Sequence, residues 1–101
     1  KIMSGGGSFT SDQLSVHKAS GTHVMITGRG RITSVQAKGH ASGQVEFHDC
    51  ATTGAVASAN LKLKYVFGEE GIDIYMPGSG VLFKDGIVAV IANSSVTITH
   101  T

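Results

Sequence analysis

Five histidines and one cysteine have the widest chemical repertoire in this sequence, since imidazole and thiolate groups bind metals and serve in nucleophilic catalysis. The histidines are His17, His23, His40, His48 and His100. None of their spacings matches the short-spaced ligand pairs typical of zinc sites. His48, Asp49 and Cys50 are consecutive, but neighbouring side chains on a strand point to opposite faces. We therefore predict exposed strand or loop histidines, with no metal, no cofactor and no catalytic residue.

Cys50 is the only cysteine, so no intrachain disulfide is possible. A catalytic cysteine needs a base close in space, whereas a free cysteine is more often a small buried hydrophobic residue. We favour the buried role. A small domain without disulfides must gain its stability from its own core or from neighbouring subunits.

The two arginines, Arg29 and Arg31, lie in the glycine-containing segment 28–31. A phosphate-binding glycine loop would require GxxxxGK[ST], or GxGxxG at the start of a helix, and neither pattern is completed here. Arginine is enriched in the ion pairs of protein interfaces. Two interpretations stay open: a turn with two solvated cations, or a contact with acidic groups of a partner.

Composition narrows the class of protein. The chain has 101 residues, 15% of them charged and 41% hydrophobic, with a formal charge of +1. That balance argues against a dedicated nucleic-acid binder and against a highly charged disordered chain. Val, Ile and Thr supply 27 residues and Leu only 4, and β-branched residues favour strands. The length suits one all-β domain.

The order of turn signals predicts about eight short strands. They are expected at residues 22–27, 31–37, 44–49, 60–67, 72–76, 81–83, 87–91 and 96–100. Strands spaced in this way are typical of a sandwich or barrel, and we expect a jelly-roll-like β-sandwich over residues 12–101. Residues 1–11 are Gly/Ser-rich and predict a flexible arm. Residues 51–59 predict a loop or short turn.

The strand at 87–91 is apolar on both faces. Ile87, Ala89 and Ile91 share one face, and Val88 and Val90 share the other. A strand of this kind must be covered on both sides. We expect a second subunit or another protein to cover Val88 and Val90; the alternative is that residues 14–16 fold over them. Tyr75 is expected to point away from the core.

Several segments resemble small β-sandwich structural proteins of tailed bacteriophages. The matching segments are Gly30-Arg31-Ile32 followed by Gly43 to Asp49, the Thr/Gly/Ala-rich stretch 51–59, and the last third, with Gly80 to Phe83, Asp85 to Val90 and Val96-Thr97-Ile98. The likeness runs from Thr27 to Thr101. It implies a structural protein of the virion and leaves its position there open.

The sequence and the resemblance together favour an assembly component. Our leading hypothesis is a capsid decoration (cement) protein, made in the host cytoplasm, which stabilises the major capsid lattice as a homo-oligomer, expected to be a trimer. The alternatives are a tail, head–tail or fibre-attachment component and, in another class, a carbohydrate-binding module; an enzyme ranks behind these. No contact with nucleic acid or membrane is expected. The expected interface residues are Ile2, Met3, Phe9, Arg29, Arg31, Val88 and Val90.

Overall fold

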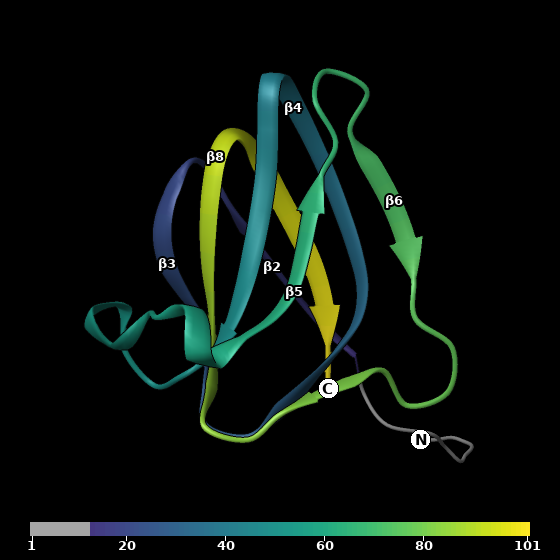
Figure 1. Cartoon of the computed structure of the whole chain (residues 1–101). Helices are drawn as coiled ribbons and strands as arrows, with labels where there is room; N and C mark the ends of the chain where they lie inside the picture. The colour runs from purple at the N-terminus through teal and green to yellow at the C-terminus, as the bar shows by residue number, and fades with distance from the viewer. Residues whose placement is uncertain (1–12) are drawn as a thin grey trace.

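Seven antiparallel strands make up the part of the chain that the computed structural model describes, residues 13–101 without the His40 side chain (Figure 1). The strands are β2 (Leu14–Lys18), β3 (Gly21–Thr27), β4 (Gly30–Asp49), β5 (Leu61–Val66), β6 (Ile72–Tyr75), β7 (Val81–Phe83) and β8 (Gly86–His100). Two short 3₁₀ turns, η1 (Thr53–Ala55) and η2 (Ser58–Asn60), separate β4 from β5. The all-β prediction is confirmed, and the strands form one curled sheet. The expected arm lies outside the described residues.

The two long strands, β4 and β8, each turn over at the top of the molecule and run back down (Figure 1). In place of β4, and likewise in place of β8, the sequence predicts two shorter strands joined by a loop or turn. The structure instead keeps each pair as one strand with a bend, between Gly39 and Gln44 in β4 and at Asn93 in β8. Asn93 has a φ of 52°, in the left-handed region that asparagine tolerates better than most residues.

The bends divide the sheet into two halves. Half-sheet A contains β2, residues 94–100 of β8, residues 30–39 of β4, and then β6 and β7. Half-sheet B contains β3, residues 86–92 of β8, residues 44–49 of β4, and β5. Because both halves share β4 and β8, bending these two strands brings the halves face to face.

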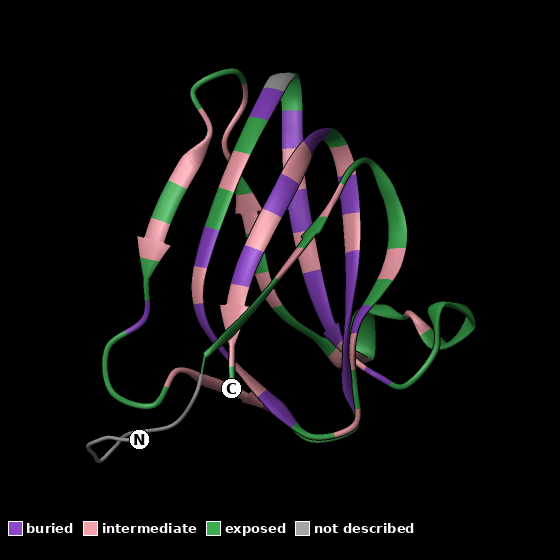
Figure 2. Cartoon of the chain, turned by 180° about the vertical axis from the view of Figure 1, so that it is seen from behind, coloured by how far each residue is buried: buried purple, intermediate pink, exposed green. Residues whose placement is uncertain are grey.

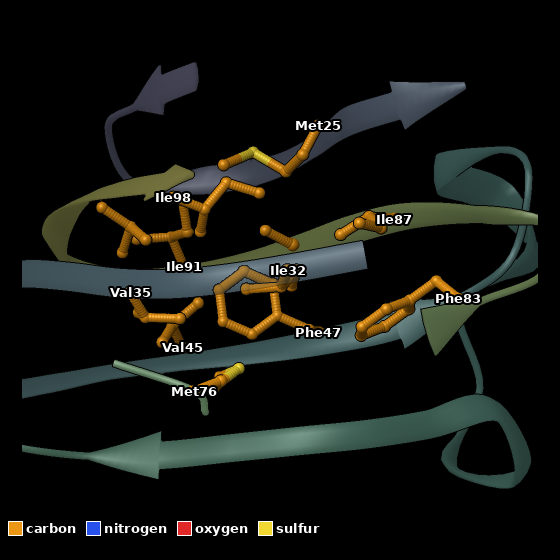
Figure 3. Packing of buried hydrophobic residues seen from close by; sticks show 12 residues of the cluster. Met25, Ile32, Val35, Val45, Phe47, Met76, Phe83, Ile87, Ile91 and Ile98 are labelled. Carbon is orange, nitrogen blue, oxygen red and sulfur yellow. The ribbon is translucent and has the colours of Figure 1, made fainter. Parts of the chain in front are cut away.

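The core lies between the two half-sheets (Figure 3). Buried and more exposed residues alternate along the bent strands, as expected for a sheet with one face covered (Figure 2). The buried cluster comprises Met25, Ile32, Val35, Val45, Phe47, Met76, Phe83, Ile87, Ala89, Ile91, Val96 and Ile98. Ile87, Ala89 and Ile91 thus face the core, as the sequence predicts.

Two glycines at the bend of β4, Gly39 and Gly43, are packed together beneath Phe67. A Cβ atom on Gly43 would lie 2.8 Å from Cε2 of the Phe67 ring and 2.9 Å from the carbonyl oxygen of Gly68. The amides of Phe67 and Gly68 both donate to the Gly43 carbonyl, at 3.0 and 3.2 Å. The chain after β5 therefore closes over this corner, and there is no room for a side chain at either glycine.

We expect Gly43→Ala to lower the free energy of unfolding by about 1–3 kcal/mol, because the added methyl group overpacks the corner. Urea denaturation measures this loss. Gly54→Ala is the matched control, since a Cβ at Gly54 would meet nothing within 4 Å. A Gly43→Ala protein as stable as the Gly54→Ala protein would show that the corner is not closely packed.

Candidate interaction surfaces

The outer face of half-sheet B presents valines to solvent. Val66 on β5 is 71% exposed and Val24 on β3 is 36% exposed, while Val90 on β8 is half-buried. Between Val90 and β5 lies the ion pair of Lys64 Nζ with Glu46 Oε2, at 3.4 Å. We refer to Val24, Val66 and Val90 as the valine face. The exposed valines add apolar area to this face, and the Glu46–Lys64 ion pair lies among them, so the face is mixed in chemistry.

Val88 shares this outer side of β8 but is fully buried within the single chain. It pairs with Val24 on one side and His48 on the other. The segment 51–60 lies against this end of the sheet, where η1 contacts β3 and His48 bonds to η2 (Figure 1). The expectation that Val88 contacts a partner is therefore wrong. The covering segment is also not residues 14–16, which pair with β8 much further along, at residues 98–100.

The imidazole of His48 holds that covering segment in place. Its Nδ1 lies 2.8 Å from Asn60 Oδ1 and 3.0 Å from the Ala57 carbonyl, and its Nε2 lies 3.0 Å from Glu46 Oε1. The hydrogen bond from His48 is the main cause that lowers the pKa of Glu46. His48 is thus a buried structural residue, in contrast to the exposed histidine that the sequence predicts.

Asp49 and Cys50, the other two residues of the possible ligand triplet, have separate partners. The carboxylate of Asp49 accepts hydrogen bonds from the amides of Asp85 at 2.8 Å and Lys84 at 3.0 Å. Burial by itself would raise the pKa of Asp49, but these donors and the nearby charge of Lys62 outweigh it and lower the pKa. The Cys50 thiol is buried, which raises its pKa. Within residues 13–101, no three His, Cys, Asp or Glu side chains gather around a possible metal position.

Of the expected interface residues, those that lie within residues 13–101 do not form one surface. Ile2, Met3 and Phe9 lie outside the described residues. Arg29 is exposed in the turn before β4, and Arg31 is half-buried beside a groove lined by Gln13, Thr33 and Ser79. The turn that carries Arg29 lies beside Gly86, the first residue of β8. Val90 is four residues further along β8, about 13 Å from Gly86. Of the seven residues, only Val90 belongs to the valine face.

The outer face of half-sheet A is polar, and it was not among the sites predicted from the sequence. Cross-strand neighbours form one row of Ser15, Thr99, Ser34 and Tyr75, a second row of His17, Thr97, Gln36 and Asp73, and a third of Ser95 and Lys38. We call this set the polar face. A shallow groove of about 340 Å³ follows the second row. The alternation of polar residues in these strands was the available signal, but it does not distinguish a binding face from a solvated one.

Acid is expected to destabilise the fold, with Asp49 as one main contributor. A carboxyl whose pKa is lower in the folded state stabilises that state above its unfolded pKa, and the stabilisation is lost as pH falls through the folded value. Glu46 and Asp49 both behave in this way. The pKa of His100 is lowered by burial, which also favours the folded state at higher pH.

We expect Asp49→Asn to reduce the free energy of unfolding at pH 7 by about 1–3 kcal/mol, since a neutral amide replaces a charged acceptor of two amides. Between about pH 5 and pH 2 the variant should lose less further stability than the unmodified chain. Urea titrations at several pH values measure both effects. Asp73→Asn is the control, because the Asp73 carboxylate bonds to no group of residues 13–101; equal acid profiles for the two variants would refute the role of Asp49.

Three comparisons with known proteins, against protein-family models, curated proteins and solved structures, found no match for this chain. Among the described residues, no helix is long and apolar enough to cross a membrane.

Proposed function

We propose that this chain is a bacteriophage virion structural protein, and specifically a capsid decoration protein that binds the major capsid lattice as a homo-oligomer, a trimer. Its place would be the capsid surface. The two half-sheets would then correspond to the two layers of a jelly-roll-like β-sandwich. The resemblance of residues 27–101 to small virion proteins of tailed phages supports the class.

The valine face is the observation that carries the proposal. An antiparallel sheet with one covered face normally presents polar residues on the other, and half-sheet A does so. Half-sheet B presents Val24, Val66 and the half-buried Val90 on its outer side, beside the polar residues Thr22, Gln44, Glu46 and Lys64. Residues 51–60 lie against the end of this half-sheet where Val88 is buried. We infer that another copy of the chain or the capsid protein covers the three remaining valines.

A small interface of this kind suits a component present in many copies. Each contact is weak, and an array of linked contacts gains strength because every further contact forms at high effective concentration. The same surface would serve a tail, head–tail or fibre-attachment component. The number of copies in a purified particle, relative to the major capsid protein, separates these positions.

We expect Val66→Asp and Val90→Asp to abolish oligomerisation or particle binding while each monomer stays folded. Binding at the valine face would desolvate the introduced carboxylate, and the cost of burying this charge disfavours the interface. Sedimentation measures the oligomeric state, binding to purified particles measures attachment, and urea denaturation reports folding. Glu46 lies directly beside Val90, so a carboxylate introduced at Val90 would also be repelled by Glu46. Val66→Asp tests the same face without that repulsion.

Val88→Asp and Gln36→Asp are the matched controls. Val88→Asp should unfold the monomer, with a loss of at least about 3 kcal/mol, because it places a charge in a fully buried position. Gln36→Asp, on the polar face, should change neither folding nor assembly. If the Val66 and Val90 variants assemble and bind particles as the unmodified chain does, the valine face is not an interface and the proposal fails.

A further inference from the structure

The second and third rows of the polar face have hydrogen-bonding capacity that residues 13–101 do not use. The side chains of Gln36, Lys38 and Asp73 make no hydrogen bond or ion pair to any group of residues 13–101. His17 bonds through Nδ1 alone, 2.6 Å from Thr97 Oγ1. A carboxylate, an amide, an ammonium group and an imidazole nitrogen therefore line one groove with their donors and acceptors available.

Tyr75 lies on the same outer face as this groove, in the neighbouring row of cross-strand residues. It follows Asp73 by two residues on β6, so both side chains point to the same face, about 7 Å apart along the strand. The Tyr75 ring is 71% exposed. Within residues 13–101 it is the most exposed aromatic side chain, whereas Phe47 and Phe83 are fully buried in the core. An exposed aromatic ring offers an apolar surface with a polar tip.

We propose that the polar face of half-sheet A, from His17 across to Asp73 and Tyr75, is a binding site for an oligosaccharide. Adjacent sugar hydroxyls both donate and accept hydrogen bonds, so they match the acceptor of Asp73 on β6 and the neighbouring Gln36 and Lys38 on β4. The apolar face of a pyranose ring matches the exposed ring of Tyr75. This site does not depend on the proposed function, since it uses the half-sheet opposite the valine face.

The dimensions and charge of the groove favour this ligand over others. About 340 Å³ lies at the lower end of the range of small-molecule sites, about 300–1,000 Å³. The row from His17 to Asp73 crosses four strands, about 14 Å, which suits several linked sugars better than one. Lys38 and Asp73 contribute one charge of each sign, unlike the arginine clusters that recognise phosphate.

The test is a titration of the ¹⁵N-labelled full chain with maltohexaose, cellohexaose and oligogalacturonate, followed by amide chemical shifts. We expect at least one of these to shift the amides of residues 34–38, 72–75 and 95–99, with a Kd of about 1 mM. Tyr75→Ala and Asp73→Asn should each weaken that binding by about tenfold or more. Val66→Ala, on the valine face, should leave the Kd unchanged.

Both site variants alter exposed side chains, and an unchanged urea midpoint shows that they remain folded. The proposal is overturned if none of the three oligosaccharides shifts these amides, if the shifts map to half-sheet B, or if Tyr75→Ala and Asp73→Asn bind as tightly as the unmodified chain. Loss of oligomerisation in the valine-face variants has no bearing on these outcomes.

Discussion

The fold depends on the close approach of Gly39 and Gly43 at the bend of β4. A continuous strand can serve both halves of a sheet only if it turns sharply, and at this corner Phe67 and the Gly68 carbonyl occupy the space of any side chain. Because β8 pairs with β4 on both sides of the corner, it must bend at the same level, and Asn93 takes the left-handed conformation there. Two local backbone features thus produce the core between the half-sheets.

Everything else in the described sheet is attached to these two strands. Each of β2, β3, β5, β6 and β7 pairs with only β4 or β8 among the described strands, so side chains must secure the open edges. Lys62 on β5 reaches β7, where its Nζ donates to the Leu82 carbonyl at 2.8 Å and lies 5.6 Å from the centre of the buried Phe83 ring. Lysine on an edge strand also discourages pairing with other chains, and here it links the edges of the two half-sheets.

Alternation along the sequence predicts the strands and most of the core, and it fails where the register shifts. Ile32 and Val35 are three residues apart and both buried, because the register shifts between Ile32 and Ser34. Leu61 and Leu63 are two residues apart, a spacing that puts both on one face of a regular strand, yet a register shift opposite Phe47 and His48 leaves Leu61 37% exposed. Val88 was assigned to a partner because no local pattern shows that residues 51–60 return to this end of the sheet, where His48 bonds to Ala57 and Asn60. Tyr75, in a regular stretch of β6, points outward as predicted.

The contrast between the two outer faces follows from the same bend. Folding one sheet over its core gives a small chain two outer surfaces on opposite sides, built from alternate residues of the same two strands. On β8, the outward residues change from Val88 and Val90 before Asn93 to Ser95, Thr97 and Thr99 after it. The core cluster takes apolar residues from both parts of β8, Ile87, Ala89 and Ile91 before Asn93 and Val96 and Ile98 after it, so core packing does not account for this change. Water accounts for hydroxyl groups on half-sheet A, but it does not account for exposed valines on half-sheet B. The exposed valines of half-sheet B, and not the hydroxyl groups of half-sheet A, are therefore the feature that solvation by water leaves unexplained.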